Sequence, residues 1–127
     1  MNTLIDTVVR RGDVVWADLQ GATGAEKQKK RPCVVVQNNT GNARSPLTIV
    51  VPLTDASAYR SYPQQVLVGE AELWSGAKDS VVDCGHIRSI DKARRVDSSK
   101  GVICTLSKET MDKVDAALHA TLGMVCK

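Results

Sequence analysis

Short apolar runs, rich in valine and separated by turn-forming residues, make up most of this chain. Runs of about 4–8 such residues, bounded by Gly, Pro, Asn or Asp, are typical of β-strands. A turn at Arg11-Gly12-Asp13 precedes the first run, a second turn covers residues 38–42, and longer loops cover residues 20–30 and 54–63. The pattern predicts strands over residues 14–19, 33–37, 48–53, 65–68, 80–84, 86–90 and 101–104.

The spacing of apolar residues changes near the end of the chain. Ser107 is a suitable N-cap for a helix that Gly123 would end. Within it, one apolar stripe is formed by Met111, Val114, Leu118 and Leu122. The 127 residues suffice for one core and are too few for two ordinary domains. We therefore expect one mainly β domain over residues 1–127, a small, bent antiparallel sheet or barrel with the C-terminal helix against one face.

The composition supports a valine-filled core. Phenylalanine is absent, and the hydrophobic and charged fractions, 43% and 24%, are those of a folded soluble protein. The four cysteines (33, 84, 104 and 126) form no CxxC pair and have no histidine at zinc-finger spacing, so we expect no metal site. No signal-peptide core or membrane-length apolar run is seen. These features predict a cytoplasmic protein with reduced thiols and no membrane association.

Basic residues concentrate in two places. Four of the five residues 27–31 are basic, and a second group comprises Arg88, Lys92, Arg94 and Arg95. Proline fixes its own φ and keeps the preceding residue extended, so Pro32 holds Arg31 at a loop-to-strand junction, where its guanidinium can face an anion. A run of cations suits a polyphosphate partner, although for either group taken alone a solvated surface is the simpler explanation.

Cations and aromatic residues together indicate a nucleic-acid partner. Lys27 and Arg31, with Lys29 and Lys30, would meet phosphates. Tyr59 and Tyr62 flank Arg60, and stacking on an unpaired base stabilises a complex by roughly 1–3 kcal/mol. The alternative is that both tyrosines fold back on the edge of the core.

The candidates for catalysis are few, because the chain has no paired-carboxylate, P-loop or GxSxG motif. RNA can be cleaved by its own 2′-OH if the protein moves two protons and stabilises the phosphorane. Arg31 suits the last role by charge and geometry, and the Thr54 hydroxyl can reach the same phosphate. Glu26 and His86 are the remaining polar candidates, the latter for proton transfer. Structural roles stay open for Thr54, as a strand-end cap, and for His86.

These residues also stand in an order that resembles the MazF/PemK/Kid toxins. The resemblance covers residues 10–124 with few gaps and is carried by their combination rather than by any single piece. The matching pieces are Arg11-Gly12-Asp13-Val14, Ala17-Asp18-Leu19, Gly24-x-Glu26, Arg31-Pro32, Val34–Asn38, Ser45-Pro46 leading to Thr54, Asp79–Val81, Ile87–Lys92 and Met111–Leu118 with Leu122-Gly123.

The resemblance implies an SH3-like β-barrel that forms a homodimer. It implies an endoribonuclease that needs no metal or cofactor and cuts single-stranded RNA, leaving a 2′,3′-cyclic phosphate and a 5′-OH. Arg31 and Thr54 match the family's catalytic residues, and Glu26 and Asn38 match loops along the RNA groove. The implied partner is an antitoxin whose acidic, disordered tail occupies the same groove, which fits the basic loop.

Three departures from the family pattern bear on mechanism. The loop before Arg31-Pro32 is more basic than in many relatives, Gly85 stands where some members carry a catalytic Asp, and Ala25 stands where some carry a His. These departures disfavour a mechanism based on an Asp and a His, so the resemblance implies a mechanism based on Arg31 and Thr54. His86 stands where several relatives have Gln, so it reads a base edge or assists proton transfer.

Two other functions remain open at this point. The same barrel serves a gyrase-inhibiting toxin family, but the terminal Trp-Gly-x-Ile of that family is absent from this chain. An RNA-binding module without catalysis would use the basic loop alone and bind in a salt-sensitive manner.

Overall fold

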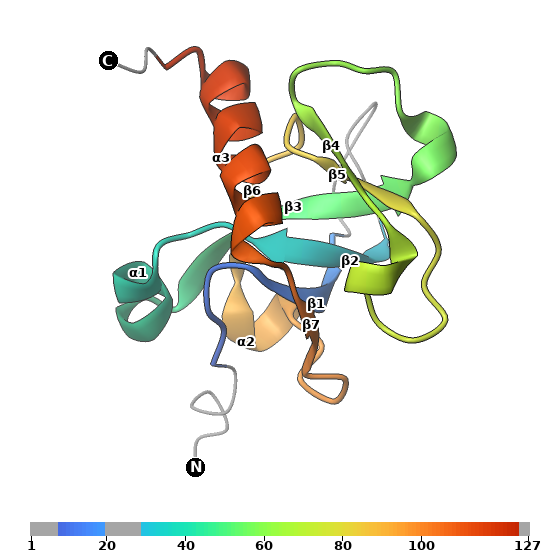
Figure 1. Cartoon of the computed structure of the whole chain (residues 1–127). Coiled ribbons are helices and arrows are strands. Elements are labelled where there is room, and N and C mark those ends of the chain that lie inside the picture. Colours follow the sequence, from blue (N-terminus) through green and yellow to red (C-terminus); the bar gives the residue numbers. More distant parts are fainter. Residues whose placement is uncertain (1–7, 20–28, 125–127) are drawn as a thin grey trace.

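The computed structural model describes residues 8–19 and 29–124, so Glu26 and Lys27 lie outside the described residues. Along the chain the elements are β1 (Asp13–Asp18), β2 (Lys30–Val35), α1 (Asn39–Arg44), β3 (Leu47–Asp55), the 3-10 turn η2 (Ala56–Ala58), β4 (Gln65–Val68), the 3-10 turn η3 (Glu70–Glu72), β5 (Ser80–Asp83), β6 (Arg88–Asp91), α2 (Lys92–Arg95), β7 (Val102–Thr105) and α3 (Lys108–Leu122) (Figure 1).

The strands form one antiparallel sheet in the order β4-β5-β3-β2-β1-β7, with β6 paired to β3. The long strand β3 changes partner along its length. Its first half pairs with β6, from Leu47 to Val50, and its second half pairs with β5, from Leu53 to Asp55. Pro52 lies at the change, which bends the sheet. This confirms the predicted fold class, a mainly β domain with a bent antiparallel sheet and a C-terminal helix.

The bent sheet buries apolar side chains on both faces. Alternate residues of β1 and β2 divide between two clusters, with Val14 and Val34 in one and Val15, Cys33 and Val35 in the other. The first cluster is covered by α3, which Figure 1 shows lying across the sheet. The second cluster lies on the face from which Arg31 extends, because Arg31 and Cys33 are two residues apart in the strand.

The C-terminal helix begins and ends as predicted. The Ser107 side chain accepts a hydrogen bond from Thr110 N, and Gly123 ends the helix with a left-handed φ of 68°. The predicted stripe is wrong at its last member, because Leu122 is 59% exposed while Ala117 is 2% exposed. The final helical turn extends past the sheet, so a residue there has nothing to pack against.

Three other boundaries differ from the prediction. Residues 38–42 were predicted as a turn, but Asn38 caps the short helix α1. Strand β2 begins at Lys30 rather than at Cys33, so Arg31 lies within it. His86 lies in a turn before β6 and not in a strand, since His86 N donates to Asp83 O at 3.3 Å. Among the described residues, no helix combines the length and apolar character that crossing a membrane requires.

Candidate functional site

Arg31 and Thr54 lie on neighbouring strands at corresponding positions. The β2–β3 register pairs Val34 with Val51 and Cys33 with Pro52, and the same register continued by two residues sets Arg31 opposite Thr54. Residues opposite each other in antiparallel strands project from the same face of a sheet. The two predicted catalytic side chains therefore project from the same face of the sheet.

The strands stop bonding to each other just before this pair. The carbonyl groups of Lys29 and Val35 accept hydrogen bonds from Leu19 N and Gly12 N, so the odd-numbered residues of β2 bond toward β1. The backbone N–H and C=O groups of the even-numbered residues point toward β3 instead, and Pro32 is one of these residues. Since proline has no N–H, Pro32 cannot donate to β3, and the ladder ends at Cys33. From Leu53 to Asp55, β3 pairs with β5 on its other edge, so the guanidinium-bearing Arg31 and the hydroxyl-bearing Thr54 lie just past the end of the β2–β3 ladder.

Cys33 follows Arg31 by two residues in β2. Its side chain is buried, and its Sγ donates to Arg31 O at 3.5 Å. Burial raises the pKa of the Cys33 thiol to about 12, and the positive charges of Arg31 and Arg88 partly oppose that rise. The thiol is therefore an uncharged part of the core.

Arg88 reaches this region from the other end of the sheet. It pairs with Val50 in the β3–β6 ladder, and its Nη1 donates to Leu19 O at 3.0 Å, at the end of β1. Arg95 Nη1 donates to the preceding carbonyl, that of Asp18, at 3.4 Å. Sequence reasoning noted both arginines as a basic group without assigning them to the site. The rest of that group lies elsewhere, since Lys92 Nζ bonds to the carbonyl of Asn42 in α1.

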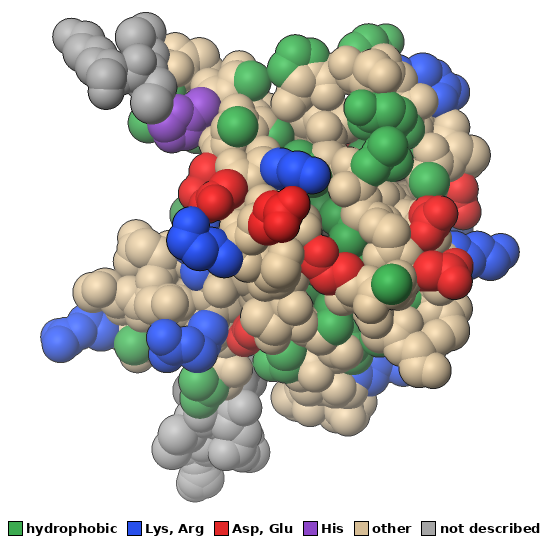
Figure 2. All heavy atoms as spheres, in the orientation of Figure 1, with side chains coloured by type: hydrophobic (Ala, Val, Ile, Leu, Met, Phe, Trp, Pro, Cys, Tyr) green, Lys and Arg blue, Asp and Glu red, His purple; other side chains and the backbone are tan. Residues whose placement is uncertain are grey.

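The face that carries α3 has a different character. Figure 2 shows acidic and basic side chains mixed on it rather than separated by sign. Arg11 and Asp115 form an ion pair at 2.6 Å, and Lys108 and Asp112 form another at 3.1 Å. The first pair joins α3 to the segment before β1 and the second lies within the helix, so this face offers a polyanion no basic track.

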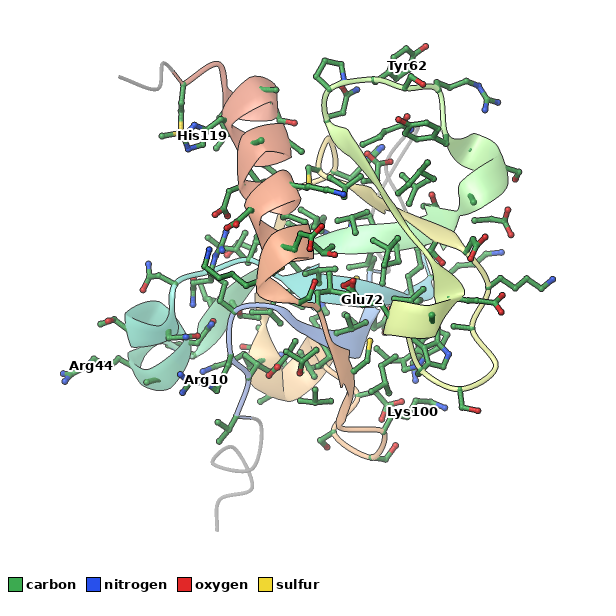
Figure 3. The ribbon with its side chains drawn as sticks, in the orientation of Figure 1. Arg10, Arg44, Tyr62, Glu72, Lys100 and His119 are labelled. Atoms are coloured by element: carbon green, nitrogen blue, oxygen red, sulfur yellow. The ribbon has the colours of Figure 1, made fainter. Side chains whose placement is uncertain are left out.

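The segments that carry Tyr62 and His86 adjoin the same end of the β4–β5 pair, where Gln65 lies opposite Asp83. Tyr62 is 54% exposed and belongs to the loop before β4 (Figure 3), so the predicted packing back on the core does not occur for it. Tyr62 O accepts a bond from Gln65 N, and Gln65 pairs with Asp83. The His86 ring lies 3.5 Å from the Asp83 carboxylate. By contrast, Thr54 pairs with Val81 near the start of β5, so within this chain His86 is separated from it along the strand.

Asn38 is engaged in structure. Its side-chain oxygen accepts a hydrogen bond from Gly41 N at 2.8 Å and caps α1. It follows the end of β2 opposite to the end that carries Arg31. The β2–β3 register therefore sets Arg31 opposite Thr54 on one face, the segments of Tyr62 and His86 adjoin one end of the β4–β5 pair, and Asn38 follows the far end of β2 from Arg31.

The described residues contain no group of three or more His, Cys, Asp or Glu side chains arranged to hold a metal ion. Two acidic groups of the described residues, Asp55 and Asp97, are bonded within their own turns, and Asp97 also forms an ion pair with Lys30 at 3.9 Å. Hydrogen bonds from Ser57 lower the pKa of Asp55, and hydrogen bonds from Ser99 lower the pKa of Asp97.

Comparison with known proteins identifies the family. Residues 10–122 match the model described as PemK-like, MazF-like toxin of type II toxin-antitoxin system. Endoribonuclease EndoA of Bacillus subtilis (strain 168) is 39% identical over 118 residues, which are 93% of this chain and 97% of that protein. Endoribonuclease MazF of Staphylococcus epidermidis is 39% identical over 117 residues, 92% of this chain and 93% of the relative.

Solved structures show the same fold. MazF (Form-I) from Deinococcus radiodurans superposes with a TM-score of 0.73 at 24% identity, covering 92% of this chain and 98% of that one. A mycobacterial structure titled as an endoribonuclease in complex with its cognate antitoxin gives 0.72 at 24% identity, with 94% and 99% covered. The chain belongs to the PemK-like, MazF-like toxin family of type II toxin–antitoxin systems.

Proposed function

We propose that this protein is a toxin that cleaves single-stranded messenger RNA in the cytoplasm and thereby inhibits translation and growth. In this proposal the 2′-OH of one nucleotide gives up its proton to solvent as its oxygen attacks the adjacent phosphorus, the P–O5′ bond breaks as the 5′ oxygen is protonated, and the products carry a 2′,3′-cyclic phosphate and a 5′-OH. No metal takes part. The names of the two relatives that are 39% identical, both endoribonucleases, support this reaction class.

The observation that carries the proposal is the placement of Arg31 opposite Thr54 at the end of the β2–β3 ladder. The guanidinium offers several N–H donors to the phosphorane oxygens, and the hydroxyl can orient the same phosphate. In this proposal Arg31 also supplies the proton to the leaving 5′ oxygen. Donors fixed before reaction stabilise developing charge without reorganising during it.

The remaining predicted residues have binding roles in this proposal. Tyr62, which is exposed, offers a ring for stacking on an unpaired base. The His86 imidazole can contact a base edge. Glu26, Lys27 and Asn38 would contact RNA elsewhere along its path, Asn38 through the amide nitrogen that its capping role does not use.

We also propose that the protein acts as a homodimer and is inhibited by a cognate antitoxin. The antitoxin's acidic, disordered tail would bind over the basic region around Arg31. One structural neighbour is titled as a complex with its cognate antitoxin, which supports a partner of this class.

A cleavage assay on a long defined RNA tests the proposed reaction. The purified protein is incubated with the RNA in EDTA, and the new ends are mapped by primer extension and tested for a 5′-OH by direct kinase labelling. We expect discrete fragments with 5′-OH ends. Arg31→Ala should reduce the rate about 100- to 1,000-fold, the usual cost of one lost oxyanion donor.

Arg44→Ala is the matched control, because Arg44 is an exposed arginine on α1 that points away from the body of the molecule (Figure 3). It should cleave as the wild type does. Intact RNA with wild-type protein would support the gyrase-inhibitor or RNA-binding alternatives, and full activity in Arg31→Ala would exclude the assigned role.

A further inference from the structure

We propose that Arg88 is a second phosphate-binding residue of the site, which holds a backbone phosphate of the RNA next to the one held by Arg31. This proposal rests on the proposed function, because it takes single-stranded RNA as the ligand. It adds a binding group from β6, a strand that contributes none of the predicted catalytic residues.

The position of Arg88 is set by long-range pairing. Its backbone lies opposite Val50 in β3, while its guanidinium bonds to Leu19 O at 3.0 Å. Leu19 N in turn donates to Lys29 O at 2.9 Å, two residues before Arg31. The Arg88 side chain therefore crosses from β6 to the end of β1 and reaches the strand end that carries Arg31.

The positive charges of both guanidinium groups act on the same buried residue. Cys33 is 0% exposed, and the charges of Arg31 and Arg88 both act on its thiol. Arg31 and Arg88 are themselves half-buried. A phosphate bound in this region is attracted by both positive charges, and partial burial strengthens that attraction.

The hydrogen bonding of Arg88 leaves N–H donors of its guanidinium available for a phosphate. A guanidinium has five N–H donors, and among the described residues the structure gives Arg88 one acceptor, Leu19 O. No carboxylate of the described residues forms an ion pair with it. A carbonyl bond fixes the direction of the group without neutralising its charge, which suits a fixed phosphate ligand.

A purely structural role for Arg88, holding the end of β1, predicts different behaviour. Such a role would change stability and the placement of Arg31, but it would not change how many salt ions are released when RNA binds. The salt dependence of binding therefore separates the two roles. For single strands, each neutralised phosphate contributes about 0.7 to the slope of log K against log salt concentration.

The test measures binding of a fully 2′-O-methylated single strand, which lacks the attacking hydroxyl, by fluorescence anisotropy at about 50–300 mM salt. The strand carries the mapped cleavage sequence. We expect Arg88→Met to reduce the slope by about 0.7 and to weaken binding roughly 10- to 100-fold. Arg88→Lys should keep the slope and bind with intermediate affinity, and Arg44→Met should match the wild type. A wild-type slope in folded Arg88→Met would overturn the proposal.

If Arg88→Met does not fold, the wild-type protein supplies the test. The ¹⁵Nε resonance of Arg88, assigned with Arg88→Lys, should shift on titration with the same strand, while that of Arg44 should not. An unmoved Arg88 resonance at saturation overturns the assignment. Cleavage of unmodified RNA by the wild type is measured in parallel, so failure of the nuclease function is seen separately from failure of the Arg88 assignment.

Discussion

The opposed placement of Arg31 and Thr54 predicts that the two side chains act on one phosphate and are energetically coupled. Opposite residues in antiparallel strands have Cβ atoms about 4.5–5.5 Å apart, and somewhat more where the strands diverge. One phosphate that accepts two hydrogen bonds of about 2.8 Å can bridge such a gap. A double-mutant cycle measures whether it does.

The expected magnitudes follow from the groups removed. Arg31→Ala removes a charged donor and should lower kcat/KM about 100- to 1,000-fold. Thr54→Val removes one hydrogen bond to a charged group, about 1.5–3 kcal/mol, or roughly 10- to 150-fold. Independent effects would multiply. If both groups hold one phosphate, removing either side chain leaves the phosphate poorly placed for the remaining one. The kcat/KM of the double variant should then lie within about tenfold of that of Arg31→Ala alone.

The assay is single-turnover cleavage of a short fluorescent RNA with enzyme in excess, and thermal melts show that each variant is folded. A control cycle pairs Arg31→Ala with Tyr62→Leu, because the Tyr62 loop lies at a different end of the sheet and its effect should multiply with that of Arg31. Multiplicative effects in the Arg31–Thr54 cycle would refute the shared phosphate, even if each single variant is slow.

Other predictions concern single side chains. If His86 moves a proton, the wild-type pH–rate profile has a step between about pH 5 and 8 that His86→Gln removes; an unchanged profile limits His86 to binding. Asn38→Ser should keep the α1 cap and the urea midpoint but weaken RNA binding, whereas Asn38→Ala should lose about 1 kcal/mol of stability; equal stability of both variants would contradict the cap. With its pKa raised from 9.0 to about 12, Cys33 has about a thousandfold less thiolate at pH 8 than in the unfolded chain, so a thiol reagent should label it only after unfolding; rapid native labelling would contradict its burial. Pro32→Ala supplies an N–H toward β3 and should draw the strands together, which lowers cleavage without lowering the melting temperature; a large loss of stability would contradict this account.

Local signals were sufficient wherever an element depends on its own residues. The helix α3 was predicted with both ends because a cap, an apolar spacing and a left-handed glycine are all readable from neighbours in sequence. The strand over residues 65–68 was predicted with its observed bounds. Helix α1 was missed because its six residues include Gly41 and are too few for a periodic pattern. The exposure of Leu122 was missed because it depends on where the sheet ends beneath the helix.

The candidate site required information that no single segment carries. Arg31 and Thr54 were each selected from the sequence, but their alignment depends on a register in which Cys33 meets Pro52. Arg88 was noted only as part of a basic group. Its approach to Leu19 follows from the pairing of β6 with β3 rather than with its neighbour in sequence, β5, and sequence spacing gives no sign of that choice.

The Arg31-Pro32 dipeptide has a wider role than its local geometry suggested. The sequence argument used Pro32 to hold Arg31 extended, which is a property of one backbone angle. In the sheet, Pro32 also faces β3 without a donor, while Pro52 lies where β3 exchanges β6 for β5. Pro32 thus lies where the β2–β3 ladder ends, and Pro52 lies where the other edge of β3 changes its partner strand. Arg31, the proposed catalytic arginine, stands one residue before this break: it has regular strand pairing on its β1 side, opposite Ala17, which fixes its backbone, and the pairing on its β3 side has ended, which is where the proposal puts the phosphate.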